Sequence, residues 1–203
     1  MPRTRPLHPP RFVPPGRARQ VTSGDAAPPL ALVDLDGRAV EVPDPVHLVH
    51  LQLRRFAGCP VCNLHLRTVV TRLDELTRAG VGEVVVFHST VDDLRPHAAD
   101  LPFPVIADPD KVLYRAFGVE ASPRSILSPR VWPTIVRAIA ATIRGTIRGT
   151  DRPPALFPRG GRYGLPADVL IAPDGTVVAA KYGEHADDQW SVDEVLARAR
   201  AAR

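Results

Sequence analysis

The feature that most constrains the fold of this chain is an abrupt change of apolar periodicity at Cys59. Residues 46–53 read V-H-L-V-H-L-Q-L, with apolar side chains at nearly every other position, which is typical of a β-strand. Over residues 60–79 the apolar residues instead recur every three or four positions, as on one helix face: Cys62, Leu66, Val69, Leu73 and Leu76. Pro60 suits the first helical position and Gly80 suits the helix end. The sequence therefore predicts a strand, a short turn and a helix, with Cys59 at the junction.

The pair Cys59 and Cys62 carries the chemistry that the sequence indicates. A cysteine at a helix N-terminus lies beside unpaired backbone N–H groups and the positive end of the helix dipole, which favour the thiolate. In such motifs the thiol pKa falls from about 8.5 to roughly 3.5–7.5, and the thiolate is the species that attacks. A second cysteine one helical turn further on is close enough to form a disulfide. The pattern therefore predicts a redox couple that attacks an oxidised substrate and then resolves the intermediate.

Two other interpretations of the cysteines stay open at this point. Cys59, Cys62 and His65 are residue types that bind zinc, and His47 or His50 is available as a fourth ligand. Zinc motifs usually bring a second close pair of cysteines, however, and the chain has only two cysteines. In the other interpretation both cysteines are buried and inert. The Gly-Cys-Pro context at a loop-to-helix junction argues against this for Cys59, and less strongly for Cys62, which shares the apolar helix face.

Strands and helices continue to alternate beyond the cysteine motif. Short apolar runs predict buried strands, and Asp-Gly turns between apolar runs predict hairpins. Acidic residues three positions after a threonine or a serine predict helix N-termini. These patterns predict hairpins over residues 30–42 and 168–181 and strands over residues 83–88 and 103–106. They also predict three helices: one capped by Thr90, one over residues 108–117 and one that begins at Ser191.

The first 23 residues are expected to form a flexible arm ahead of one domain over residues 24–203. Proline and arginine dominate up to about residue 29, and apolar residues show almost no periodicity there.

The 26 basic and 22 acidic residues give a net charge of +4 and are spread along the chain, so nucleic-acid binding is not indicated. Apolar runs such as residues 84–87 are too short to span a bilayer. Because the N-terminus shows no apolar signal core, we expect a cytoplasmic protein.

Residues 121–163 interrupt the alternation of strands and helices. Isoleucines recur there every four residues, with arginines beside them: Ile135, Ile139, Ile143 and Ile147, and Arg137, Arg144 and Arg148. Such a stripe predicts a helix that covers an apolar surface of its own domain or of a second subunit. A basic amphipathic helix at a lipid surface is the alternative. We expect a helical lid or a dimer contact that borders the cysteines and restricts which substrates enter.

Several stretches, taken in order, resemble one known family. They read C-P-V-C, E-V-V-V-F-H-S-T, F-P-V-I-A-D-P-D, Y-R-A-F-G-V and L-P-A-D-V-L-I-A-P-D-G-T-V. Together they are similar to the peroxiredoxin-like branch of the thioredoxin superfamily, the group described as alkyl hydroperoxide reductase/thiol-specific antioxidant. The resemblance runs from about residue 24 to residue 199, without residues 121–163.

The resemblance implies an α/β, thioredoxin-like fold. In that fold a central mixed β-sheet is flanked by helices, the cysteine motif follows a central strand, and here a helical insertion precedes the strand of Pro166. The resemblance also implies that Pro166 is a cis-proline that faces the cysteines and presents its neighbouring backbone to an extended substrate. Leu165, Pro166 and Pro60 are therefore expected to contact the substrate. A trans proline at the start of a strand is the alternative.

The chain departs from the usual site of this family at two positions. The family usually carries threonine or serine three residues before its attacking cysteine. Aligned on P-V-C, that cysteine is Cys62, and Cys59 holds the hydroxyl position. The arginine that usually follows the late loop is missing from the L-P-A-D stretch, and Arg54, Arg55 and Arg162 are candidates to replace it. A thioredoxin-like division of labour, in which Cys59 attacks and Cys62 resolves, therefore fits the sequence better.

We therefore predict a thiol–disulfide oxidoreductase of peroxiredoxin-like type that reduces disulfides or hydroperoxides. One rival is a true peroxidase with Cys62 peroxidatic and Cys59 resolving. The other is a non-catalytic redox-sensing or interaction module. The chemistry needs no bound cofactor and no metal, and a dithiol such as thioredoxin would resupply the electrons. A homodimer fits this account, whereas nucleic acid and stable membrane insertion do not. Asn63 and His65 are expected on the solvated side of the helix.

Overall fold

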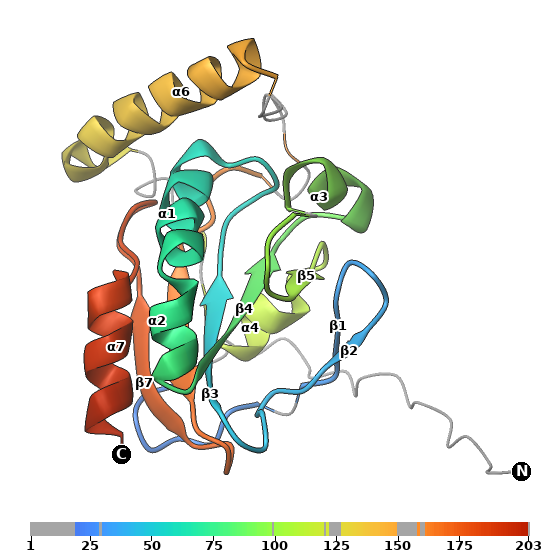
Figure 1. The fold of residues 1–203 in the computed structure, drawn as a ribbon, viewed down its shortest axis with the longest axis vertical. Coiled ribbons are helices and arrows are strands. Elements are labelled where there is room, and N and C mark those ends of the chain that lie inside the picture. Colours follow the sequence, from blue (N-terminus) through green and yellow to red (C-terminus); the bar gives the residue numbers. More distant parts are fainter. Residues whose placement is uncertain are drawn as a thin grey trace, which may run out of the picture.

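A mixed β-sheet lies at the centre of the fold (Figure 1). The computed structural model describes residues 19–28, 30–98, 100–119, 121, 127–149, 158 and 161–202. Among them the sheet has the order β5 (Val105–Ala107), β4 (Val81–Phe87), β3 (Leu48–Leu53), β6 (Ala167–Ile171) and β7 (Val177–Tyr182). β3, β4 and β5 are parallel, whereas β6 is antiparallel to β3 and to β7. The predicted mixed sheet of a thioredoxin-like fold is confirmed.

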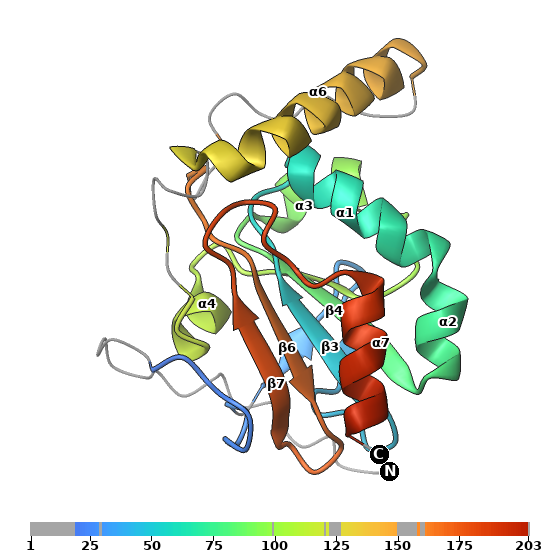
Figure 2. The same ribbon diagram turned by 90° about the vertical axis from the view of Figure 1, so that its left-hand side faces the viewer.

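Helices cover both faces of the sheet (Figures 1 and 2). One face packs against α1 (Pro60–Thr71), α2 (Leu73–Arg78), α3 (Val91–Ala98) and α7 (Val192–Ala201). The other face packs against α4 (Val112–Ala116) and the small hairpin of β1 (Leu32–Val33) and β2 (Ala39–Val40). The sheet therefore separates two apolar cores, and each buried strand contributes side chains to both.

The central strand β3 is buried on both faces, although its sequence alternates between apolar and polar residues. Val49, Leu51 and Leu53 point into the core beside α4. His50 and Gln52 point to the opposite face and are equally buried there. The prediction of a strand was correct, but the polar positions are not solvated. They instead belong to a buried polar network beneath α1 and α7.

The helix predicted over residues 60–79 is two helices that meet at Arg72. Pro60 occupies the first turn of α1, as predicted, and Gly80 follows α2 with a φ of 65°. The backbone at Arg72 leaves helical geometry, with φ −114° and ψ 18°. Its side chain binds Glu75 at 2.7 Å and Asp193 of α7 at 2.8 Å. The apolar face continues across the break, because Leu66 and Val69 of α1 and Leu76 of α2 belong to one core cluster.

The two predicted hairpins and the predicted helix caps are present. β1 pairs with β2, and β6 pairs with β7 across the turn at Gly175. The Ser191 side chain and Glu194 form a reciprocal capping box at the start of α7. The hydroxyl of Thr90 accepts from the N–H of Asp93 at 3.2 Å at the start of α3. Local sequence chemistry therefore fixes these element boundaries.

The prediction that Pro166 is a cis-proline is wrong. Within the described residues the one cis peptide bond joins Val42 and Pro43. Pro166 directly precedes β6, is buried, and accepts from the N–H of Gly183 at 2.9 Å through its carbonyl. A proline at the first position before a strand leaves no ladder hydrogen bond unmade, so it needs no cis bond to fit there.

The insertion contains α6 (Trp132–Ile147), preceded by the short 3₁₀ turn η1 (Pro129–Val131). α6 lies across the N-terminal end of α1 (Figures 1 and 2). Of the two surfaces that the isoleucine stripe was expected to cover, its own domain is wrong, whereas a contact with a second subunit stays a prediction. Only Ile135 packs against the core, and the side that faces α1 carries small residues instead. The buried residues of η1 and α6 are Val131, Thr134, Ala138 and Gly145. Small side chains let the two helix backbones approach closely, which bulky isoleucines would prevent.

The described part of the N-terminal region already packs at Val21. Val21 is buried and its N–H donates to the Tyr182 hydroxyl at 2.8 Å, and the N–H of Gly24 donates to the Val177 carbonyl at 2.9 Å. Most of the predicted arm lies outside the described residues. Among the described helices, none is long and apolar enough to cross a membrane.

Candidate active site

The turn that carries Cys59 is held against the end of β4. The carbonyl of Arg55 accepts from the N–H of His88 at 3.1 Å, and the N–H of Ala57 donates to the Ser89 hydroxyl at 2.9 Å. Gly58 has a φ of 71°, and a Cβ at this position would lie 2.8 Å from the His97 ring of α3. Only glycine fits both the left-handed backbone and this close approach. The chain therefore enters α1 along a fixed path.

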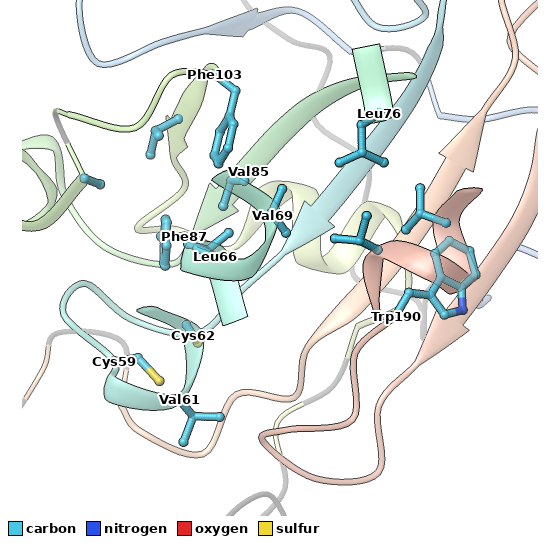
Figure 3. Packing of buried hydrophobic residues seen from close by; sticks show 14 of the residues in the cluster. Cys59, Val61, Cys62, Leu66, Val69, Leu76, Val85, Phe87, Phe103 and Trp190 are labelled. Atoms are coloured by element: carbon cyan, nitrogen blue, oxygen red, sulfur yellow. The ribbon is translucent and has the colours of Figure 1, made fainter. Parts of the chain in front are cut away.

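Both cysteines are completely buried at the N-terminal end of α1 (Figure 3). Cys59 is the residue that caps α1, and its carbonyl accepts the first helical hydrogen bond from the N–H of Asn63 at 2.9 Å. Cys62 lies within the first turn and is part of the same apolar cluster as Leu66 and Phe87. Both thiols are free in this structure. Both sulfur atoms of the motif therefore lie beneath a closed surface.

Arg55 supplies the cation beside Cys59. Its Nη1 lies 3.6 Å from the Cys59 Sγ, and its Nη2 donates to the backbone carbonyl of Arg162. Burial by itself raises the pKa of Cys59. The Cys62 thiol, the Arg55 guanidinium and the backbone N–H groups of Cys62 and Val61 outweigh it and lower the pKa from 9.0 to about 6. These contacts therefore favour the thiolate form of Cys59.

Cys62 is shifted in the opposite direction. Burial, together with the hydrogen bond and the negative charge of Cys59, raises the pKa of Cys62 well above 9.0. A protonated Cys62 can donate its hydrogen to the Cys59 thiolate, which stabilises the anion. Two neighbouring thiols whose pKa values are pushed apart have different chemical roles. The pKa values of the two neighbouring thiols are thus shifted in opposite directions.

Of the three arginines proposed to complete the site, only Arg55 contacts a cysteine in the described structure. Arg54 is also buried, but its guanidinium turns to Asp168 at 2.7 Å. Arg162 contributes its backbone carbonyl to Arg55. The alternation of β3 explains the difference between Arg54 and Arg55. Arg54 continues the polar face of His50 and Gln52, and Arg55 comes after the strand has turned toward Cys59.

A balanced set of buried charges lies beside the cysteines, on the same face of the sheet. His50 Nδ1 lies 2.8 Å from Glu83, and its Nε2 lies 3.0 Å from Asp168, which also binds Arg54. Gln52 connects Glu83 to Arg54. Two cations and two carboxylates are thus paired without net charge. The sequence alone does not reveal this network, because its members are distant from one another along the chain.

The network sets the charge of its histidine. Burial alone would lower the pKa of His50, but Glu83 and Asp168 raise it from 6.5 to about 9. Since each ring nitrogen faces a carboxylate oxygen, the doubly protonated ring is the form that satisfies both partners. Burial raises the pKa of Asp168, but Arg54 and His50 lower it far below its usual range. His50 and Asp168 are therefore both ionised at neutral pH.

The residues of the alternative zinc interpretation do not converge. Both ring nitrogens of His50 are engaged by carboxylates, and His47 is exposed beside Asp44. In the described part of the chain, no group of three or more possible ligands is placed to hold a metal ion. His65 is half-buried rather than solvated as predicted, and its Nε2 lies 3.4 Å from Arg54. Burial and Arg54 lower the pKa of His65 to about 3.

The residues predicted to contact the substrate, Pro60, Leu165 and Pro166, lie at the same end of the central strands as the cysteines. Pro60 follows Cys59 directly in α1. Ala167 pairs with Leu53 at the end of β3, which places Leu165 and Pro166 beside the turn that carries the motif. Whether these three residues contact a substrate remains a prediction.

A groove of about 470 Å³ adjoins Gly58 between α1 and α3. Leu66, Phe87 and Leu94 form part of its floor, and Asn63 and His97 lie among its polar lining residues. A second hollow, of about 700 Å³, lies at the far ends of β3 and β4. Of these two hollows, the groove beside Gly58 is the one next to the cysteine motif. The sequence analysis did not single out His97, because no motif links it to Cys59.

Replacing Arg55 with methionine is expected to raise the pKa of Cys59 by about two pH units, since burial remains while the nearest cation is lost. The thiolate fraction at pH 7, and with it the alkylation rate of Cys59, would fall about tenfold. In the unchanged protein this rate should increase with pH through about 6 and then level off. The matched control is Arg78→Met, an exposed arginine of α2. An unchanged rate profile in Arg55→Met would contradict this assignment.

Comparison with known proteins identifies a family. Residues 68–185 match the family model described as AhpC/TSA antioxidant enzyme, which is more than half of the 203 residues. The matched region begins after the two cysteines. No curated protein matches the chain.

Solved structures share the fold over nearly the whole chain. Peroxidoxin BcpB from Mycobacterium tuberculosis is 17% identical to this chain, with a TM-score of 0.63. The match covers 91% of this chain and 99% of the BcpB chain. Peroxiredoxin Q from Xanthomonas campestris is 18% identical, with a TM-score of 0.56, and the match covers 92% of this chain and 98% of that protein's chain. A protein described as thiol:disulfide interchange protein DsbE, from Chlorobium tepidum, is 19% identical with a TM-score of 0.56, covering 90% and 98%. At these identities the likeness shows the fold alone.

Proposed function

Because the chain belongs to the AhpC/TSA antioxidant enzyme family, we propose that it is a peroxiredoxin-like thiol oxidoreductase in which Cys59 attacks and Cys62 resolves. The observation that carries this assignment is the contact of Arg55 with the Cys59 sulfur, at 3.6 Å. This contact supports Cys59 as the anion of the pair, and the thiolate is the nucleophile in this chemistry. The oxidised substrate is a hydroperoxide or a disulfide.

With a hydroperoxide, the Cys59 thiolate attacks the terminal oxygen and the O–O bond breaks. The alkoxide takes up a proton and leaves as an alcohol, and Cys59 becomes a sulfenic acid. The Cys62 sulfur then attacks the Cys59 sulfur, a disulfide forms, and water leaves with the Cys62 proton. The two electrons that reduced the peroxide come from the two thiols. A partner dithiol returns them by reducing the Cys59–Cys62 disulfide.

With a disulfide, the Cys59 thiolate attacks one sulfur of the substrate and the first substrate thiolate leaves. The mixed disulfide is then attacked by the Cys62 sulfur, which releases the second substrate thiol. The product is again the Cys59–Cys62 disulfide, so both reactions use the same resolving step. Arg55 is expected to stabilise the thiolate before attack and the returning thiolate after reduction.

Substrate access requires movement of the cover above Cys59. Its sulfur has no solvent-exposed surface, and Val131 and Ala138 of the η1 and α6 region belong to the same buried cluster. The groove beside Gly58 adjoins the residue before Cys59 and offers an approach to the motif. We expect small displacements of α6 or of the His97 ring to open this approach.

The experiment that tests the proposed function compares three oxidants. The reduced protein is mixed with hydrogen peroxide, with an organic hydroperoxide and with a model disulfide, and formation of the Cys59–Cys62 disulfide is followed over time. Rapid formation with at least one oxidant, and its reversal by reduced thioredoxin, are expected. Negligible rates with all three would indicate a redox sensor or interaction module instead. In Cys59→Ser, a sulfenic acid forming on Cys62 at the wild-type rate would make Cys62 the peroxidatic residue.

A further inference from the structure

The outer face of α6 is a continuous apolar stripe exposed to solvent. Side chains 132, 136, 139, 143 and 147 lie within an arc of about 80° around the helix, given 3.6 residues per turn. Their exposed fractions are 55% for Trp132, 62% for Val136, 47% for Ile139, 54% for Ile143 and 80% for Ile147. Singly exposed apolar residues are normal, but an aligned row over four turns is not. This stripe, named here the α6 stripe, lacks a partner among the described residues.

The α6 stripe is not the surface by which α6 holds to its own domain. The opposite side of the helix carries the buried Thr134, Ala138 and Gly145. Thr134 also donates its hydroxyl hydrogen to Asp187 at 2.6 Å, which fixes the helix to the segment before α7. The helix is thus anchored through its inner face, and the stripe stays available on the outer face.

The charges along α6 are all of one sign. Arg137, Arg144 and Arg148 are exposed and follow one flank of the stripe. The sequence contains no aspartate and no glutamate anywhere in residues 121–150. Within the described chain, none of these three arginines pairs with a carboxylate. A partner that complements this surface must therefore be apolar beneath the stripe and anionic beside it.

We propose that α6 docks on the surface of an anionic lipid bilayer. The stripe would enter the boundary between headgroups and acyl chains, with Trp132 at its start, and the arginines would pair with anionic headgroups. A second copy of the chain fits less well, because stacking two α6 stripes brings arginines of equal charge together at their flanks. The helix lies on the surface and does not cross it, which agrees with its length of 16 residues.

Docking in this way fixes the orientation of the cysteine site. The inner face of α6 covers the N-terminal end of α1, where Cys59 lies, and the stripe is on the outer face. The two thiols would therefore be separated from the bilayer surface by about one helix diameter, roughly 10 Å. The proposal does not depend on which cysteine attacks.

Vesicle binding of the full-length protein tests the proposal. Vesicles of phosphatidylcholine alone are compared with vesicles that also contain phosphatidylglycerol, by sedimentation and by tryptophan fluorescence. Binding is expected only with phosphatidylglycerol, and it should weaken at high salt. Trp132 is exposed and the other tryptophan, Trp190, is buried, so a blue shift on binding reports α6. Trp132→Phe should abolish that shift.

A double variant separates α6 from other basic regions of the chain. Ile139→Asp with Ile143→Asp is expected to reduce the vesicle partition coefficient at least about tenfold. Both positions are about half-exposed, so the fold should be retained, as checked by thermal unfolding. The matched control is Val46→Asp with Val112→Asp, exposed valines away from α6 that add the same charge. This control should bind like the unchanged protein.

Several outcomes would overturn the proposal. One is the absence of binding to anionic vesicles, and another is equal loss of binding in the α6 variant and the valine control. A stable dimer by light scattering that only the α6 variant disrupts, without vesicle binding, would assign the stripe to self-association. Vesicle binding without a change in Trp132 fluorescence would assign the interaction to another surface.

Discussion

Replacing Cys59 with serine is expected to reduce turnover of every oxidised substrate by at least about a thousandfold. The serine hydroxyl is not ionised at neutral pH, so Arg55 has no anion to stabilise and no nucleophile remains in its place. Steady-state peroxide or disulfide consumption, with a thioredoxin system as the electron source, measures this loss. Because Cys59 is fully buried and serine is smaller, thermal unfolding should be recorded in parallel.

The matched variant Cys62→Ser should behave differently. Cys59 keeps its Arg55 contact, so the first attack continues, but no second thiol resolves the product. With a hydroperoxide we expect a trapped sulfenic acid on Cys59, and with a disulfide we expect a stable mixed disulfide on Cys59. Mass spectrometry detects both adducts. Full turnover in Cys62→Ser, or an adduct on Cys62 in the unchanged protein, would contradict the division of labour.

The second large effect concerns the stability of the fold. Replacing Asp168 with asparagine is expected to lower the free energy of unfolding by about 3–5 kcal/mol, because it leaves Arg54 and His50 buried without their shared carboxylate. Denaturant unfolding measures the change. The control is Asp36→Asn, whose side chain is 56% exposed and pairs with Arg38 at 3.0 Å. Its loss should stay below about 1 kcal/mol.

The same network predicts how stability depends on pH. The pKa of His50 is raised from 6.5 to about 9, so its contribution to stability is complete below 6.5 and is lost as the pH rises through about 9. The contribution of Cys59 to stability instead grows as the pH rises through part of this range, because its pKa is lowered from 9.0 to about 6. The measurement therefore belongs in the Cys59→Ser background. There the free energy of unfolding should fall between pH 6.5 and 9, and a rise would contradict the account.

Much of the fold was predictable because local patterns determine it. The switch from alternating to helical periodicity located β3 and α1, and the Asp-Gly turns located both hairpins. The break at Arg72 was not predictable, because the apolar repeat runs through it without interruption. At the break the Arg72 side chain pairs with Asp193, which is distant in sequence.

The sequence predicted the two cysteines of the candidate site but not the residues that surround them. The motif located Cys59 and Cys62, and the missing family arginine pointed to a substitute. Which arginine serves depends on how the chain leaves β3, and only the structure showed that Arg55 reaches the sulfur. The alternation of polar and apolar residues in β3 predicted a strand, but it did not show that the polar residues are buried. Their burial depends on Glu83 and Asp168 from neighbouring strands, which no local pattern reveals.

The insertion shows the limit of periodicity most clearly. A row of isoleucines indicates a helix but does not decide which face of that helix is buried. In α6 the domain contact was made by Ala138 and Gly145, and Ile139, Ile143 and Ile147 stayed exposed. Close packing against α1 favours small residues. A hydrophobicity pattern instead points to the isoleucines as the buried positions, because alanine and glycine are less hydrophobic.

The most direct test of the central claim is limited alkylation of the reduced protein near neutral pH, followed by peptide mass mapping. Cys59 carries the lowered pKa and Cys62 the raised one, so the label should appear first on Cys59. Its rate should level off well below pH 9, the ordinary range of a thiol. Modification of Cys62 before Cys59 would contradict the assignment of Cys59 as the attacking thiol.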